Sequence, residues 1–150
     1  MENRFEVSEV KLTYKTTQKA SDRPKVINSN SVYRILLNCY DADTIEYRES
    51  FKVLLLNRNH KVLGVMNVSE GGISGTPVDI RLILQAALLS NASMIIISHN
   101  HPSGNLSPSN ADDLVTLKVQ RACDAMDIKL YDHLILSSES YYSYSDEGQL

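Results

Sequence analysis

The chain has little cysteine, no long apolar stretch and no leader-like start. Of its 150 residues only Cys39 and Cys123 are cysteines, and neither has zinc-type spacing to another ligand. We therefore expect no disulfide framework and interpret both as small buried hydrophobes in the reducing cytoplasm. The start, MENRFEVSEV, lacks the apolar segment of a signal peptide. No apolar stretch approaches the ~20 residues of a membrane span, so no membrane partner is expected.

Clusters of basic residues are also missing. The chain carries 15 Lys and Arg against 18 Asp and Glu, for a net charge of -3, and no two basic residues are adjacent. Phosphate binding depends on clustered Lys and Arg, so the sequence does not favour nucleic acid as the main partner. Folding could still gather the scattered basic residues, namely Arg23, Lys25, Arg58, Lys61, Lys118 and Arg121.

The length and the hydrophobic content of 43% are ordinary for one globular domain with its own core. Residues 5–14 partly alternate apolar and polar side chains, as a half-buried strand does. Residues 15–30 are polar and predict a loop or arm. We therefore divide the chain into an N-terminal strand with a polar arm, residues 1–29, and one domain, residues 30–150.

Within that domain, apolar runs alternate with helical patterns. The expected strands are residues 50–57, 61–68, 93–98 and 128–136, with a hairpin turn at 57–60. The expected helices are residues 32–40, capped by Asn30 or Ser31, then one from Asp79 to about residue 90, and 109–126. Residues 41–49 predict a charged connector, and Gly71, Gly72 and Gly75 an irregular segment. This order predicts an α/β domain with a mixed sheet.

The apolar residues of two of these helices follow different patterns. The helix after Asp79, IRLILQAALLS, is apolar on nearly all sides, so we expect it to be largely buried. In the helix at 109–126 the apolar positions are Leu114, Leu117, Ala122 and Ala125.

A group of potential metal ligands follows the apolar run MIII. Side chains alternate along a strand, so His99 and His101 point to the same side, about 6–7 Å apart along the backbone. Asp112 lies in the first turn of the next helix, and the intervening loop can bring its carboxylate back to the histidines. Two histidines, one carboxylate and an open fourth position are typical of a catalytic zinc site.

Other interpretations fit the same residues. A His-x-His pattern alone occurs by chance in many chains. Ser109 and Asp112 have the spacing of a helix capping box, and Asp112 with Asp113 would favour the helix dipole. Capping and metal ligation can coexist, because a capped first turn would hold Asp112 in place.

The full pattern resembles a known signature. His-x-His, seven residues, Ser, two residues and Asp is similar to the JAMM motif of the MPN (JAB) metalloprotease superfamily. The string HNHPSG followed by PS and D resembles the RadC branch, as does DHLILSSESYYSYSDEG from Asp132 to Gly148. The similarity covers about residues 30–150. RadC proteins usually begin with a helical DNA-binding-like domain, for which residues 1–30 are too short, so that domain's role is not carried over.

The resemblance implies a cytidine-deaminase-like fold, a mixed sheet with helices on both sides. It also implies Zn²⁺ held by His99, His101 and Asp112, with water in the fourth position. Family members that hydrolyse peptides use a glutamate before an early central strand. Glu49 precedes SFKVLLL in this way, with Glu46 and Glu70 as weaker candidates, although Glu49 could also be an ordinary surface acid.

The residue between the histidines limits what can be carried over. Asn100 follows the RadC variant instead of the Ser or Thr that the JAMM pattern often has. Substrates of the eukaryotic deubiquitinases are therefore not carried over.

The chemistry expected from these residues is hydrolysis. Zinc lowers the pKa of its water towards ~7, Glu49 would move the proton, and Ser109 could donate to the developing oxyanion. Asp132 and His133 could orient a ligand or be structural, and His60 is expected to be solvated. The sequence predicts a zinc-dependent hydrolase of peptide or isopeptide bonds acting on a protein or peptide. The alternatives are a non-catalytic MPN interaction module and a DNA-associated RadC-type protein.

Overall fold

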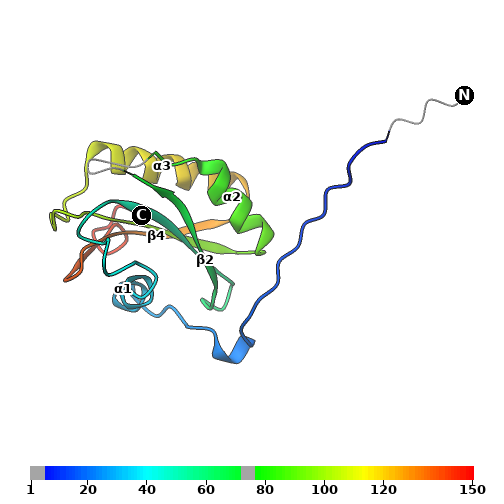
Figure 1. Cartoon of the computed structure of the whole chain (residues 1–150), viewed down its shortest axis with the longest axis horizontal. Coiled ribbons are helices and arrows are strands. Elements are labelled where there is room, and N and C mark those ends of the chain that lie inside the picture. The colour runs from blue at the N-terminus through cyan, green and yellow to red at the C-terminus, as the bar shows by residue number, and fades with distance from the viewer. Residues whose placement is uncertain (1–5, 72–76) are drawn as a thin grey trace, which may run out of the picture.

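The computed structural model of the chain describes residues 6–71 and 77–150, and here five strands form one mixed sheet. The strand order is β2-β1-β3-β4-β5. Figure 1 labels β2 and β4 in the layer between α1 and the other two helices. The strands are β1 Ser50–Leu56, β2 Val62–Glu70, β3 Met94–Asn100, β4 Lys129–Leu136 and β5 Tyr141–Ser143. Only β3 and β4 pair in parallel, and the other neighbours are antiparallel. The predicted α/β domain with a mixed sheet is confirmed.

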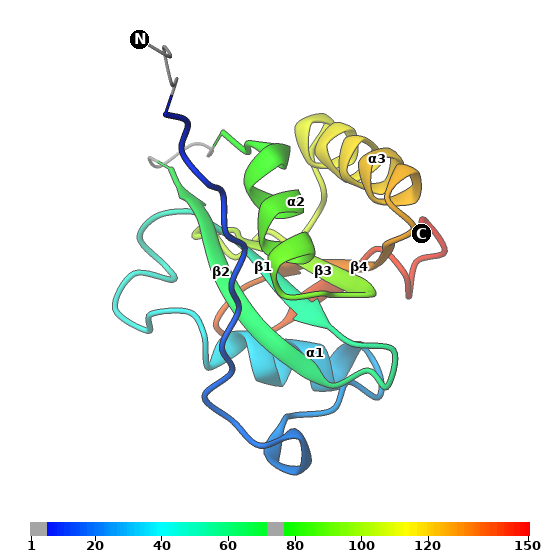
Figure 2. The ribbon, with the colours of Figure 1, turned by 90° about the vertical axis from the view of Figure 1, so that its right-hand side faces the viewer.

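Helices cover both faces of this sheet. Helix α1 (Ser29–Leu37) lies on one face, and α2 (Ile80–Leu89) and α3 (Asn110–Ala125) lie on the other (Figure 2). Side chains of a strand alternate between faces, so Leu54 packs in the core layer with α1. Val53 packs in the layer with α2 and α3. The run SFKVLLL is nearly all apolar because β1 is covered on both faces.

The path from β3 to β4 positions the functional residues. The two strands are parallel, so the chain must cross over between them, and α3 forms that crossover. The turn after β3 contains Gly104, whose φ of +79° is favoured by glycine. The carboxyl end of β3 and the amino end of α3 therefore lie beside the same loop.

Two helix details differ from the sequence expectation. Helix α1 begins at Ser29, because the Asn28 side chain accepts from the Ser31 amide in a capping box, so the expected cap at Asn30 or Ser31 is wrong. Helix α2 does begin after Asp79, whose carboxylate caps it. However, α2 buries only one face, and its other leucines stay partly exposed, at 40% for Leu82 and 50% for Leu88.

The apolar positions Leu114 and Leu117 of α3 do not form its packing face. Thr116, Val119 and Cys123 are buried, whereas Leu114 and Leu117 are 59% and 40% exposed. The buried residues recur at i, i+3 and i+7, and the more polar Thr116 is included because it has hydrogen-bond partners inside.

Several segments outside the main elements differ as well. Residues 6–14 are extended and exposed but pair with no strand, contrary to expectation. Cys39 is only half-buried, just beyond α1, while Cys123 is buried as expected. His60 is not merely solvated, because its ring packs edge-on against Tyr131, with 5.3 Å between centroids. Gly71 lies outside regular structure, and Gly72 and Gly75 fall outside the described residues. Strand β5 was not predicted.

Across residues 6–71 and 77–150, no helix combines the length and the apolar character needed to cross a bilayer.

Asp132 holds the C-terminal segment against the sheet. Its side chain is 2% exposed and accepts hydrogen bonds from the Ser143 hydroxyl at 2.6 Å and the amides of His133 and Ser145 at 2.7 and 3.0 Å. Burial raises the pKa of this carboxyl although the three donors oppose the change. None of these bonds points to the histidines of β3, so the structure gives Asp132 the structural role of the two considered.

We expect Asp132→Ala to lower the free energy of unfolding by about 2–4 kcal/mol, because it leaves buried donors without an acceptor. Urea denaturation measures this change. Asp124→Ala, at an exposed position of α3, is the control and should stay within about 0.5 kcal/mol of the parent. Equal stability of the two variants would show that the Asp132 network is dispensable.

Candidate metal centre

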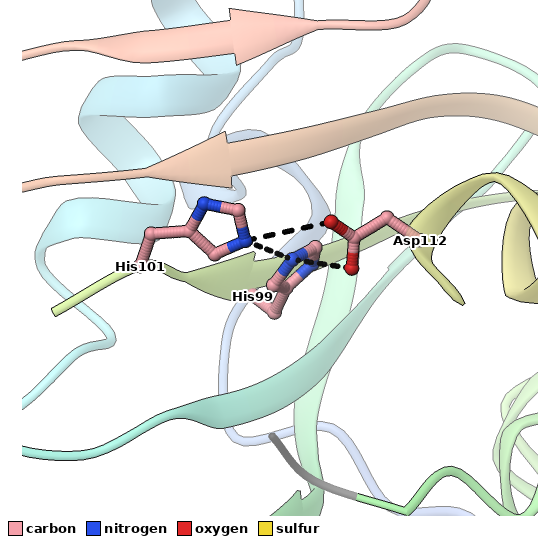
Figure 3. Close-up of side chains that lie close together, drawn as sticks. All are labelled: His99, His101 and Asp112. Atoms are coloured by element: carbon pink, nitrogen blue, oxygen red, sulfur yellow. Dashed lines mark hydrogen bonds and ion pairs between the residues drawn. The ribbon is translucent and has the colours of Figure 1, made fainter. Parts of the chain in front are cut away.

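The structure brings together the three side chains expected to bind metal. His99, His101 and Asp112 each present one ligand atom, and these atoms lie within 4.8 Å of one another. His99 Nε2 is 3.0 Å from His101 Nε2 and 3.1 Å from Asp112 Oδ1 (Figure 3). His101 Nε2 is 3.5 Å from Asp112 Oδ2. The group could hold a metal ion.

The two histidines form hydrogen bonds through Nδ1, which leaves the Nε2 atom of each ring to bind a metal. His101 Nδ1 is hydrogen-bonded to the Asn105 carbonyl, which can only accept, so Nδ1 carries the proton and Nε2 is free. His99 Nδ1 lies 2.9 Å from His133 Nε2. In both rings the nitrogen that faces Asp112 is Nε2, so the donor set of two imidazoles and a carboxylate fits a divalent metal.

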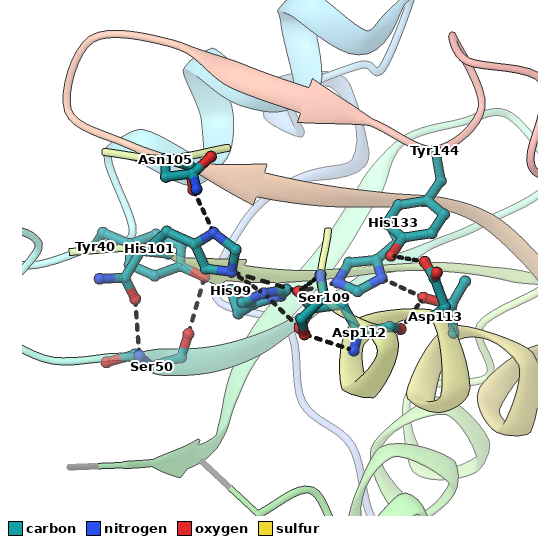
Figure 4. Close-up of polar contacts among 12 residues, drawn as sticks. Tyr40, Ser50, His99, His101, Asn105, Ser109, Asp112, Asp113, His133 and Tyr144 are labelled. Carbon is teal, nitrogen blue, oxygen red and sulfur yellow. Dashed lines mark hydrogen bonds and ion pairs between the residues drawn. The ribbon is translucent and has the colours of Figure 1, made fainter. Parts of the chain in front are cut away.

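A buried chain of hydrogen bonds sets the tautomer of His99. Thr116 Oγ1 donates to the Asp112 carbonyl at 2.6 Å and lies 2.6 Å from His133 Nδ1. The His133 ring in turn lies beside His99 (Figure 4). Because the Thr116 hydroxyl proton is donated to the Asp112 carbonyl, the Thr116 oxygen must accept the proton of His133 Nδ1. His133 Nε2 then carries no proton and accepts a hydrogen bond from His99 Nδ1. His133 therefore contacts a potential metal ligand directly and is also fully buried. His133 is thus placed to orient the His99 ring and is also a buried histidine with hydrogen-bond partners on both ring nitrogens.

Aromatic rings fix the planes of these histidines. Tyr144 stacks on His133, with 4.8 Å between centroids and an interplanar angle of 6°. Phe51 stacks on His99 at 5.9 Å and 4°. The Tyr144 hydroxyl donates to Asp113 at 2.8 Å, which turns that acid away from the histidine pair. Of the two neighbouring acids, only Asp112 joins the metal group.

The electrostatics of the site favour a charged Asp112. Burial alone would raise the pKa of Asp112, but its contacts with the imidazole nitrogens of His101 and His99 and with the Ser109 amide together outweigh burial and hold that pKa well below its usual value. The contact with Asp112 likewise raises the pKa of His101, with a smaller contribution from the charge of Glu49. Burial lowers the pKa of His133 and keeps that ring neutral.

Ser109 and Asp112 form the capping box that the spacing allowed. Ser109 Oγ accepts from the Asp112 amide at 3.2 Å, and Asp112 Oδ2 accepts from the Ser109 amide at 2.7 Å. The carboxylate nevertheless remains beside both histidines. Helix capping and placement of the potential ligand therefore occur together.

The metal group opens into a cleft of about 970 Å³ between β2, α2 and α3. Glu49 and Ser109 line this cleft together with the histidines and Asp112. Most of the remaining wall is apolar, with Phe51, Val68, Ile80, Leu82, Leu114 and Val115. The weaker glutamate candidates have other partners: Glu46 accepts from Ser138 at 2.7 Å, and Glu70 pairs with Arg48 at 2.7 Å. Among the described residues neither lines the cleft.

Asn100 is a positioning residue that the sequence analysis missed. Its buried side chain accepts from the Ser50 amide at 2.7 Å and donates to the Arg48 carbonyl at 2.9 Å. These bonds bracket Glu49 on both sides in the chain. The sequence did contain a signal for this role. Asn100 stands between two histidines that share one face of the strand, so its side chain must point to the opposite face.

Comparison with known proteins agrees with this geometry. Residues 26–149 match the family model of the RadC-like JAB domain. The chain is 47% identical over 100 residues to a UPF0758 protein of Flavobacterium johnsoniae, covering 67% of this chain and 44% of that protein. It is 38% identical over 135 residues to a UPF0758 protein of Porphyromonas gingivalis, covering 89% and 58% respectively.

The chain thus spans about half the length of the curated relatives it matches. The family match extends over most of the described structure and includes both histidines, Asp112 and the bracketed Glu49. The chain belongs to the family of RadC-like JAB domains.

Proposed function

We propose that this domain is a zinc-dependent hydrolase of peptide or isopeptide bonds. The observation that carries the proposal is the open cleft in which His99, His101 and Asp112 converge with Glu49 at the same wall. Two imidazole nitrogens, one carboxylate oxygen and a free fourth position are the donor set of catalytic zinc sites. A purely structural zinc site would be closed by a fourth protein ligand.

Zinc held by His99, His101 and Asp112 would supply a Lewis acid and lower the pKa of a bound water towards ~7. Glu49 would accept a proton from the attacking water and deliver it to the leaving amine. Ser109 Oγ already accepts from the Asp112 amide, so its own proton is available to donate to the developing oxyanion. His133 and Thr116 keep the His99 ring in the tautomer that ligation requires.

The cleft also indicates the kind of substrate. Its apolar wall suits an extended protein or peptide segment with apolar side chains near the bond to be cut. A non-catalytic interaction module would need neither a complete ligand set nor a glutamate held beside it. The hydrolase is therefore the function that these residues support best.

We expect about one zinc per chain, and we expect its loss in His101→Ala and Asp112→Ala, because each removes one of three protein ligands. Elemental analysis of protein purified without chelator measures the content. Asp113→Asn is the matched control, since this neighbouring acid is bonded to Tyr144 and not to the histidines. Protein that contains no zinc and takes up none afterwards would contradict the assignment.

We expect Glu49→Gln to retain zinc and lose at least about 100-fold in hydrolysis, because the residue moves protons and does not bind the metal. A peptide library analysed by mass spectrometry, with and without chelator, measures cleavage. Glu46→Gln should leave both properties unchanged. Loss of zinc in Glu49→Gln would make Glu49 a ligand or structural residue, and full activity would move the proton transfer elsewhere.

We expect only weak binding of duplex DNA, with a Kd of about 10⁻⁴ M or weaker at physiological salt. Folding does bring Arg23, Lys25 and Lys61 together, since Lys25 pairs with Lys61 and the Lys61 ammonium donates to the Arg23 carbonyl at 3.3 Å. This cluster is small against a net charge of -3. Titration of a labelled duplex at two salt concentrations tests the expectation. Submicromolar, salt-sensitive binding that Lys61→Ala weakens would favour a DNA-associated role.

A further inference from the structure

Among the described residues, no strand pairs with the outer edge of β2 from Gly64 to Val68. Strand β2 pairs with β1 on one side. On its other side described residues meet its beginning, where the Val62 amide donates to the Pro24 carbonyl at 2.9 Å and the backbone of Lys25 pairs with that of Lys61. An open edge of this length exposes backbone donors and acceptors that can pair with another extended segment.

The N-terminal arm, residues 6–19, has the pattern of a strand that lacks its partner. Val10, Leu12 and Tyr14 recur at every second residue, and they are 83%, 75% and 42% exposed. Side chains with this spacing lie on one face of an extended segment. The arm leads away from the sheet (Figure 1), and Val10 and Leu12 remain largely exposed. The alternating apolar side chains are typical of a paired strand, yet the arm is unpaired. A second position of the arm, paired with a strand, would account for the alternation.

The arm already starts at the open edge. The Tyr14 hydroxyl donates to the Leu63 carbonyl, which shows that this carbonyl points outwards from the sheet. The earlier contact, through residues 24–26, runs antiparallel to the start of β2. The short 3₁₀ helix η1 (Ala20–Asp22) lies between these two contacts.

We propose that residues 9–14 of the N-terminal arm add to the edge of β2, within the same chain, as a sixth antiparallel strand. The Tyr14 contact brings the arm to Leu63, the residue that the pairing of β2 with β1 skips between Val62 and Gly64. Beyond this bulge the proposed register sets Leu12 opposite Val65 and Val10 opposite Asn67. Paired residues lie on the same face of a sheet, so Leu12 covers Val65, which is 44% exposed. Backbone bonds along the edge replace the single hydroxyl contact of Tyr14.

The position of this strand connects it with the cleft. The proposed pairs end at Asn67, next to Val68, which the pairing with β1 skips and which belongs to the cleft wall. The paired arm therefore extends the sheet beside the metal centre and occupies an edge to which another extended peptide could otherwise add. The inference does not depend on zinc or on hydrolysis.

A cross-link tests the register. In a Cys39→Ser background, Leu12→Cys with Val65→Cys places two thiols on opposing strands, where the separation of the Cα atoms allows a disulfide. We expect oxidised glutathione to give a cross-linked monomer, seen by mass spectrometry and non-reducing electrophoresis. Lys11→Cys with Val65→Cys is the matched control, since residue 11 faces the other side, and it should cross-link at least about tenfold more slowly.

Equal rates for the two pairs, or no cross-link in either, would overturn the proposed register. Cross-linked dimers would mean that the edge takes the arm of a second copy, which also overturns the proposal. Hydrogen exchange gives a second test in the full chain. Leu12→Pro should speed exchange of the outward amides of β2 at least about tenfold, whereas Thr17→Pro should not. Unchanged exchange in Leu12→Pro would show that the arm does not protect this edge.

Discussion

The hydrogen bond between His99 and His133 is the contact on which the arrangement of the centre depends. It joins β3 to β4 and continues through Thr116 to the backbone of α3. His99, His133 and Thr116 are all buried, and each donates a hydrogen bond to the next group along the chain. Removing one of these side chains would therefore leave its neighbour without a hydrogen-bond partner. The chain thereby ties the helix that carries Asp112 to the strand that carries both histidines.

Three consecutive residues at the end of β3 act on both faces of the sheet. His99 and His101 face the cleft, while the side chain of Asn100 holds the connector that leads into β1. Strand alternation makes this division possible, because neighbouring side chains point in opposite directions. The same short segment therefore places the ligands and brackets Glu49, although Glu49 is about fifty residues away in sequence.

Local patterns in the sequence predicted what local physics determines. The apolar runs of β1, β3 and β4, the start of α2 and the convergence of three potential metal ligands were predicted correctly. The packing face of α3, the partner of His133 and the role of Asn100 depend on contacts between distant segments, which periodicity does not contain. Thr116 illustrates the limit, because a threonine is buried there only through bonds to His133 and the Asp112 carbonyl.

Asp112 shows why helix capping and metal ligation need not compete. A carboxylate has two oxygens, and Oδ2 accepts from the Ser109 amide while Oδ1 lies 3.1 Å from His99. The capping bond fixes the rotation of the carboxylate, so the orientation of the potential ligand is set by the start of the helix itself. Ligands held in this way lose little further freedom when a metal binds, and that preorganisation favours binding. The capping interpretation and the metal interpretation of this motif therefore describe one arrangement.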